Sequence, residues 1–240
     1  MFEVAAEREE FPLKEAFVIS RGSRTVATVV RVRLHDTVTG LTGHGECVPY
    51  PRYGESIDGV IADLLAMQEA IASGLGRLDL PDRMPPGAAR NALDCVFWDL
   101  EAKRAGRPAY VLAGLETPQP VITAFTLSLG EPERMREAAA RNAYRPLIKI
   151  KLGGNSSEDL ARLEAVRTGA PAAKLIVDAN EGWTVEDYQV LAPEMLRLGV
   201  AMVEQPLPAG KDEALAEIER PLPVCADESC HDRTTLAGLA

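Results

Sequence analysis

Basic residues are in the minority in this chain of 240 residues. It has 26 lysines and arginines against 36 aspartates and glutamates, and its formal net charge is −10 at pH 7. Nucleic acids and anionic membranes bind mainly to positively charged surfaces, so this balance argues against either of them as the principal partner. A small anionic substrate stays compatible with it, because a bound metal ion reverses the field inside a single cleft.

Long apolar runs are also missing. No stretch approaches the roughly 18 to 20 apolar residues that a membrane-spanning helix requires. The first residues, MFEVAAEREEF, lack the basic start and the apolar run of a secretory signal. We therefore expect a cytoplasmic protein that has no membrane partner.

Cysteines are few and scattered. The chain has four, Cys47, Cys95, Cys225 and Cys230. This pattern is typical of reduced thiols in the cytoplasm. Cys225, Cys230 and His231 are close in sequence, but no second pair completes a tetrahedral zinc site, so zinc is the weaker interpretation.

The first part of the chain has strands followed by helices. Residues 26–34, VATVVRVRL, are rich in β-branched residues and predict a strand, with a second strand over 44–48. Ser56 is a suitable N-cap for a helix, and apolar residues at helical spacing over 89–100 predict another. Segregated strands and helices predict a small α+β domain over residues 1–118.

From about residue 119 to residue 240, strands and helices alternate. Strands are predicted at 121–128, 146–152, 174–179, 200–204 and 223–227, and helices at 132–142, 157–168, 185–198 and 212–218. This repeat of roughly 25 residues favours a parallel (β/α)8-type barrel, of which about the first five strands are present. A doubly wound sheet is the alternative, but the glycine-rich phosphate turn typical of it is missing. The predicted fold class is therefore α/β, with an α+β capping domain ahead of a partial barrel.

Two lysines share one side of a predicted barrel strand. In residues 147–152, LIKIKL, side chains alternate between the two faces of the strand. The isoleucines suit the layer between strands and outer helices, so Lys149 and Lys151 are expected to point into the barrel. The alternative is that they are the protective lysines of an edge strand.

One carboxylate follows each of the next three predicted strands. Asp178 ends LIVDAN, Glu204 ends AMVEQP and Asp227 ends VCADES, about one strand–helix step apart. The carboxyl ends of barrel strands form the mouth where active sites lie, so these three side chains are expected to converge. Such ligands suit Mg²⁺. The alternative for each acid alone is a helix cap or a solvated loop charge.

These residues carry a family resemblance. The series Lys149-Ile150-Lys151, Asp178-Ala179-Asn180, Glu204-Gln205-Pro206 and Asp227-Glu228-Ser229 resembles the signature of the muconate-lactonizing-enzyme subgroup of the enolase superfamily. Three further segments resemble the bacterial L-Ala-D/L-Glu epimerases, namely FVISRGSRT at 17–25, GECVPYPRYGES at 45–56 and GAARNALDCVFWDL at 87–100. The resemblance covers essentially the whole chain.

The resemblance implies an isomerase that removes the proton α to a carboxylate and stabilises the ene-diolate with Mg²⁺. Asp178, Glu204 and Asp227 would hold one Mg²⁺. Lys151 would be the acid/base on one face of the α-carbon, and Lys149 would lower the pKa of Lys151 and help hold the substrate carboxylate. The implied substrates are L-Ala-D/L-Glu dipeptides, and the implied role is murein peptide recycling.

The same resemblance suggests which residues contact the dipeptide. Arg24, or its neighbour Arg21, would pair with the glutamate side-chain carboxylate, since a guanidinium meets a carboxylate with two hydrogen bonds. Thr126 is a candidate substrate-contacting hydroxyl. Tyr50, Arg52 and Tyr53 are candidates to line a second capping loop, although packing explains the tyrosines almost as well, and His44 is expected to be structural.

Other interpretations stay open. The family places a second lysine and an Asp-x-Asp element beyond residue 240, so we expect residues 1–240 alone to bind metal poorly and not to epimerise. o-Succinylbenzoate synthase and muconate cycloisomerase share the same metal site. A non-catalytic barrel that binds a partner through an open strand edge is a rival from another class. The sequence leaves homo-oligomerisation and the preferred dipeptide undecided.

Overall fold

The computed structural model describes residues 1–19 and 22–239, which form two compact units. The first unit comprises Met1–Leu13 and Val26–Pro120, and the second comprises Lys14–Thr25 and Val121–Ala240. The second unit therefore includes residues 14–19 and 22–25, which are distant in sequence from the rest of it. None of the helices in the described ranges is long and apolar enough to cross a membrane.

The first unit combines a three-stranded sheet with helices. The strand order is β1 (Phe2–Ile19), β2 (Gly22–Asp36) and β3 (Thr42–Cys47), and β2 pairs antiparallel with β3. The helices are α1 (Ile57–Ala66), α2 (Gln68–Ala72), α3 (Leu80–Arg83), α4 (Ala88–Ala105) and α5 (Ala109–Leu112), with short 3-10 turns η1 (Pro51–Tyr53) and η2 (Arg77–Asp79). This confirms the α+β architecture that the sequence predicts.

Local sequence sets the helix ends in this unit. The Ser56 hydroxyl accepts a hydrogen bond from the Gly59 N–H at 3.1 Å and caps α1. Gly106 ends α4 in the left-handed conformation, at φ 61°. The apolar face of α4 includes Leu93 and Val96, which are fully buried in the core of the unit.

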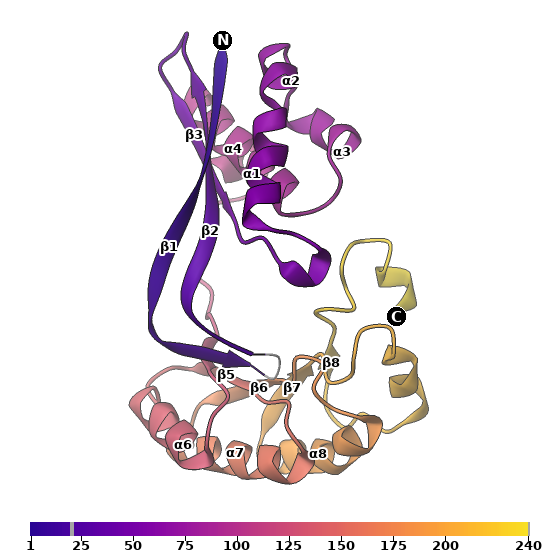
Figure 1. The fold of residues 1–240 in the computed structure, drawn as a ribbon. Coiled ribbons are helices and arrows are strands. Elements are labelled where there is room, and N and C mark those ends of the chain that lie inside the picture. Colours follow the sequence, from indigo (N-terminus) through magenta and orange to yellow (C-terminus); the bar gives the residue numbers. More distant parts are fainter. Residues whose placement is uncertain (20–21, 240) are drawn as a thin grey trace. The chain divides into compact units, whose positions relative to one another are not determined.

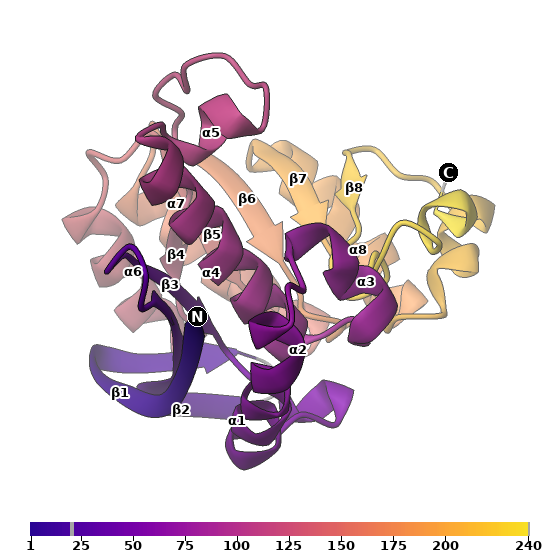
Figure 2. The same cartoon turned by 90° about the horizontal axis from the view of Figure 1, so that it is seen from above.

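The second unit is a parallel five-stranded sheet covered by helices. The strands follow the order β4 (Phe125–Leu127), β5 (Leu147–Lys151), β6 (Lys174–Asp178), β7 (Val200–Glu204) and β8 (Val224–Cys225). The helices are α6 (Pro132–Arg141), α7 (Ser156–Gly169) and α8 (Val185–Arg197), followed by 3-10 turns η3 (Asp212–Glu217) and η4 (Leu236–Gly238). Figure 1 shows α6, α7 and α8 along one face of this sheet, and Figure 2 shows β6, β7 and β8 side by side. This confirms the prediction that strands and helices alternate in the second part of the chain and form a partial barrel.

Several boundaries differ from the predicted ones. No strand is predicted over Phe2–Ile19, where half-buried and exposed residues alternate only as far as Glu7. The strand predicted at 121–128 is reduced to Phe125–Leu127, and Val121 is 81% exposed. The last strand has only two residues because it pairs with a neighbour on one side alone and follows Pro223, which has no N–H to donate. The helix predicted at 212–218 is a 3-10 turn.

Two glycines let α4 lie directly on β3. A Cβ added at Gly45 would overlap the Ala92 carbonyl oxygen and lie 2.8 Å from Val96 Cγ2. A Cβ at Gly43 would likewise overlap the Val96 carbonyl oxygen. Only residues without a side chain permit this approach, so these positions fix how the core of the first unit closes.

We expect Gly45→Ala to lower the free energy of unfolding by about 1–3 kcal/mol, because the methyl group forces α4 away from β3. Gly76→Ala is the matched control, since its added Cβ would lie 3.7 Å from its nearest neighbour, a side-chain oxygen, and its φ is −115°. Urea unfolding of the two variants measures the difference. Equal stabilities would show that the close approach of α4 and β3 is not needed.

Candidate active site

Strand β5 separates apolar and charged side chains onto its two faces. Ile148 and Ile150 are fully buried in the core that the sheet shares with its helices. Because side chains alternate along a strand, Lys149 and Lys151 lie on the opposite face, away from α6 and α7. The lysines therefore lie on the inner face of the partial barrel, as the alternation indicates.

The register of the parallel strands brings the charged residues to one edge. Lys151 is paired with Asp178 across β5 and β6, and Asp178 is paired with Glu204 across β6 and β7. Glu204 is aligned with Cys225, so Asp227 lies two residues beyond the paired end of β8. The carboxyl ends of four neighbouring strands thus present one lysine and three acids in sequence.

Asp178 is the centre of this arrangement. Its Oδ2 atom lies 2.6 Å from Lys151 Nζ and 2.8 Å from Lys149 Nζ. Lys149 Nζ also lies 2.7 Å from Glu204 Oε2, and Lys151 donates a hydrogen bond to Asn180 Oδ1 at 2.9 Å. The Asp178 side chain is fully buried, and Lys151 is only 8% exposed. Both ammonium groups therefore share one buried carboxylate, with Lys151 buried and Lys149 half-buried.

The pKa values show how strongly these charges depend on one another. Burial by itself disfavours the charged form of Lys149, but its hydrogen bonds to Asp178 and Glu204 prevail and raise its pKa. Burial likewise opposes the charge on Asp178, yet the two lysines lower its pKa below the usual range. Lys149 and Asp178 therefore stabilise each other's charged forms.

Three carboxylates form a group that suits a divalent cation, which we call the carboxylate cluster. It consists of Asp178, Glu204 and Asp227, whose ligand atoms all lie within 4.8 Å of one another. Burial and repulsion from the neighbouring acids raise the pKa values of Glu204 and Asp227. A set of oxygen donors that repel one another in a confined space fits a hard cation such as Mg²⁺.

Left-handed backbone is concentrated behind this cluster. Three residues other than glycine adopt a positive φ among the described residues, namely Asn180 at 47°, Glu181 at 66° and Gln205 at 36°. All three follow directly after the strands that end in Asp178 and Glu204. Such conformations cost about 1–3 kcal/mol each and are often found at functional sites, where surrounding contacts hold them in place.

Asp159 is a buried residue that the sequence analysis does not identify. Its Oδ2 atom accepts hydrogen bonds from the N–H groups of Gly153 and Gly154 and from Trp183 Nε1, at 2.8–2.9 Å. Its Oδ1 atom lies 2.8 Å from Arg162. Asp159 therefore fastens the loop after Lys151 to the loop after Asp178. In the sequence it is one of several acids in the first turn of a helix, so its pattern carries no signal of this role.

The residues predicted to contact substrate have different surroundings. Thr126 is paired with Lys149 across β4 and β5, which places it beside Lys149 on the same face of the sheet. Arg24 is exposed, and its guanidinium lies 5.4 Å from the centre of the Phe17 ring. Arg21 lies outside the described residues. The roles of Thr126 and Arg24 stay predictions.

The other loop candidates belong to the first unit. The Tyr50 and Tyr53 rings lie 5.8 Å apart, and the Tyr50 N–H donates to Glu55 at 2.8 Å. These contacts agree with aromatic packing inside the loop. The N–H of His44 donates to Asp99 at 2.8 Å, which is a structural contact.

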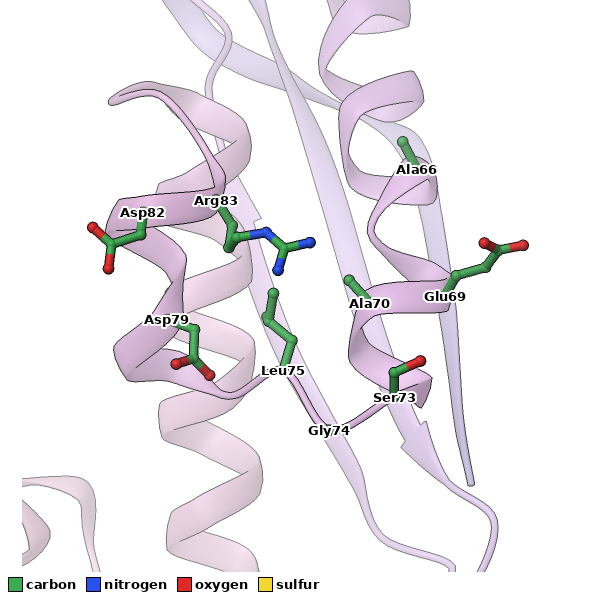
Figure 3. Close-up of a pocket in the computed structure, with 9 residues that line it drawn as sticks. All are labelled: Ala66, Glu69, Ala70, Ser73, Gly74, Leu75, Asp79, Asp82 and Arg83. Atoms are coloured by element: carbon green, nitrogen blue, oxygen red, sulfur yellow. The ribbon is translucent and has the colours of Figure 1, made fainter.

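One pocket in the first unit carries none of the predicted site residues. Figure 3 shows this pocket of about 770 Å³ between α2 and α3, lined by Ala66, Glu69, Ala70, Ser73, Gly74, Leu75, Asp79, Asp82 and Arg83. Glu69 and Asp82 point outward in opposite directions, and only Arg83 extends toward the space between the helices, so the charged groups do not converge on one point. The chemistry-bearing residues lie instead in the second unit.

The ionic network of Lys149, Lys151 and Asp178 predicts that two substitutions affect the free energy of unfolding differently when EDTA removes free metal ions. Asp178→Asn leaves Lys151 without a carboxylate partner and should lower the free energy of unfolding by about 3–5 kcal/mol. Asp227→Asn removes a repelled charge and should leave stability unchanged or slightly higher. Urea unfolding at pH 7 measures both.

The pH dependence gives a second check on Asp227→Asn. Because the folded state raises the pKa of Asp227, its charge opposes folding at neutral pH, and protonation relieves this as the pH falls through the raised value. The wild type should therefore gain stability relative to Asp227→Asn on acidification. If the wild type instead became less stable relative to Asp227→Asn as the pH falls, the raised pKa of Asp227 would be contradicted.

Two family models match the chain. Residues 1–114 match the N-terminal domain of the mandelate racemase / muconate lactonizing enzyme family, and residues 133–240 match the enolase C-terminal domain-like family. The two matches correspond to the strand–helix first part and the parallel-sheet second part of the fold.

Individual proteins agree with the family models. The chain is 46% identical to the L-Ala-D/L-Glu epimerase of Escherichia coli over 96% of this chain and 71% of that protein. An enolase family member from Agrobacterium tumefaciens with homology to dipeptide epimerases, solved with sodium and L-Ala-L-Glu, is 50% identical, with a TM-score of 0.94 over 100% of this chain and 72% of its own. A dipeptide epimerase from Cytophaga hutchinsonii, solved with Mg and D-Ala-L-Val, is 30% identical, with a TM-score of 0.87 over 98% and 67%. The fold, the convergent acids and these matches together establish that this chain belongs to the enolase superfamily.

Proposed function

We propose that this protein is a metal-dependent epimerase that acts at the glutamate α-carbon of L-Ala-D/L-Glu dipeptides. Three acids from three consecutive strands meet beside two lysines, and this single observation carries the proposal. Relatives that share the fold are named dipeptide epimerases, which supports this choice of substrate class. Murein peptide recycling in the cytoplasm is the role that this substrate suggests.

Asp178, Glu204 and Asp227 would hold one Mg²⁺. When bound, this ion supplies positive charge beside the substrate carboxylate, where negative charge develops as the α-proton leaves. Asp178 is pre-organised for this task, since its Oδ1 atom accepts a hydrogen bond from the Asn180 N–H at 2.9 Å while Oδ2 faces the lysines. A carboxylate held in this way loses little freedom when it becomes a ligand.

Lys151 is the proposed acid/base. Its amine lies on the inner face of the sheet and is held by Asp178 and Asn180, so its position is defined before substrate arrives. A lysine acts as a base only in its neutral form, and a nearby positive charge favours that form. Lys149 is the neighbouring positive charge on the same carboxylate oxygen. Its proposed second role is to help hold the substrate carboxylate.

Substrate recognition is assigned to Arg24 and Thr126. The exposed guanidinium of Arg24 would pair with the glutamate side-chain carboxylate, and the Thr126 hydroxyl would contact the substrate from its place beside Lys149. Asp178→Asn and Lys151→Ala should reduce the rate of α-proton removal with any substrate. Arg24→Ala should instead change which dipeptides are accepted. The expectation that residues 1–240 alone are inactive stays a prediction.

The test is exchange of the glutamate α-proton. We expect ¹H-NMR of the complete protein in D₂O, with Mg²⁺ and L-Ala-L-Glu, to show loss of the α-proton signal and formation of the epimer. Lys151→Ala removes the acid/base and should reduce exchange by at least about 100-fold. The matched control is Lys174→Ala, an exposed lysine at the opposite end of β6, which should exchange like the wild type.

The outcome separates the remaining candidates. Turnover of another carboxylic acid with no exchange in any Ala-Glu diastereomer would favour o-succinylbenzoate synthase or muconate cycloisomerase. No exchange with any acid, in a protein that binds Mg²⁺, would favour a non-catalytic barrel. Equal rates for Lys151→Ala and the wild type would remove Lys151 from the mechanism.

A further inference from the structure

Asp227 has less backbone support than the other two members of the carboxylate cluster. Asp178 and Glu204 are the last residues of β6 and β7, and both belong to the hydrogen-bonded ladder of the sheet. β8 ends at Cys225, so Asp227 lies beyond the ladder and is an exposed residue. Some other contact has to define the distance between the Asp227 and Glu204 carboxylates.

The Gln205 side chain makes that contact. Its Oε1 atom accepts hydrogen bonds from the Asp227 N–H at 2.9 Å and from the Ser229 N–H at 3.0 Å. The Gln205 N–H donates to the Cys225 carbonyl at 2.8 Å and continues the pairing of β7 with β8 by one step. The Gln205 side chain thus connects the end of β7 to Asp227 and Ser229, which lie beyond the last residue of β8.

The other end of the amide fixes its orientation. Gln205 Nε2 donates to the Leu207 carbonyl at 2.8 Å, to Ser229 Oγ at 2.9 Å and to Asp212 Oδ1 at 3.2 Å. Ser229 Oγ itself donates to Asp212 Oδ2 at 2.6 Å. Acceptors surround the nitrogen and donors face the oxygen, so a flipped amide would lose these hydrogen bonds. The side chain is 1% exposed, and water does not compete for these bonds.

We propose that Gln205 is a positioning residue for the metal site, which fixes Asp227 relative to Glu204 through its side-chain amide. This inference rests on the proposed function, because it concerns the Mg²⁺ ligands. Gln205 is not one of the three proposed Mg²⁺ ligands. Its left-handed backbone, at φ 36°, turns the side chain from the end of β7 toward the 227–229 loop and is held by the hydrogen bonds described above.

Magnesium affinity tests the proposal. Isothermal titration of the complete protein with Mg²⁺ alone should show at least about tenfold weaker binding for Gln205→Met, which keeps the length of the side chain and loses every hydrogen bond of the amide. Ser229→Ala is the matched control from the same cluster. It loses its own hydroxyl bonds, but the Gln205 oxygen still accepts from the Asp227 and Ser229 N–H groups, so its affinity should stay within about threefold of the wild type.

Urea unfolding in EDTA separates positioning from general damage to the fold. Gln205→Met and Ser229→Ala should both be less stable than the wild type, whereas only the first should lose Mg²⁺ affinity. If Gln205→Met does not fold, Gln205→Asn replaces it. Its amide is one methylene shorter and should weaken Mg²⁺ binding in the same direction.

Two results overturn the inference in distinguishable ways. Unchanged Mg²⁺ affinity in Gln205→Met or Gln205→Asn, or an equal loss in Ser229→Ala, would show that the amide does not position the ligand. Equal Mg²⁺ binding by the wild type and Asp227→Asn would instead overturn the proposed metal site, and the role of Gln205 with it.

Discussion

The shared carboxylate of Asp178 is the interaction on which the rest of this site depends. It is fully buried and holds two ammonium groups on one oxygen, at 2.6 and 2.8 Å. Two lysines on one face of a buried strand would otherwise repel each other where water does not screen them. The parallel register makes the arrangement possible, because it aligns Lys151, Asp178 and Glu204 across three neighbouring strands. A shift of one residue in one strand would send its charged side chain toward the helices.

The loops behind the strands complete what the register begins. Asp159 connects the loop after β5 to the loop after β6, and Gln205 connects the end of β7 to the loop after β8. Both are polar side chains that are almost fully buried and bind backbone N–H groups. Buried groups of this kind are well defined in position because no water offers them an alternative partner. The ligands and the proposed acid/base thus stand on a frame of hydrogen bonds that spans four strands.

The two lysines neutralise only part of the negative charge of the three carboxylates at this site. Lys149 forms ion pairs with Asp178 and Glu204, while burial and then repulsion from neighbouring acids raise the pKa values of Glu204 and Asp227. The site therefore carries more negative charge than its two lysines neutralise. A divalent cation relieves this excess, which relates the stability of the fold to the chemistry proposed for it.

The sequence by itself determined the periodic features. Alternation in 147–152 placed the lysines opposite Ile148 and Ile150, and the spacing of Asp178, Glu204 and Asp227 indicated one acid for each strand, since both follow from local geometry. The family resemblance through these motifs came from the sequence as well. Only the tertiary structure decided the length of β8, the left-handed backbone at Gln205 and the partners of Asp159, because these depend on neighbours distant in sequence. An acid in the first turn of a helix looks the same in the sequence whether it faces water or ties two loops together.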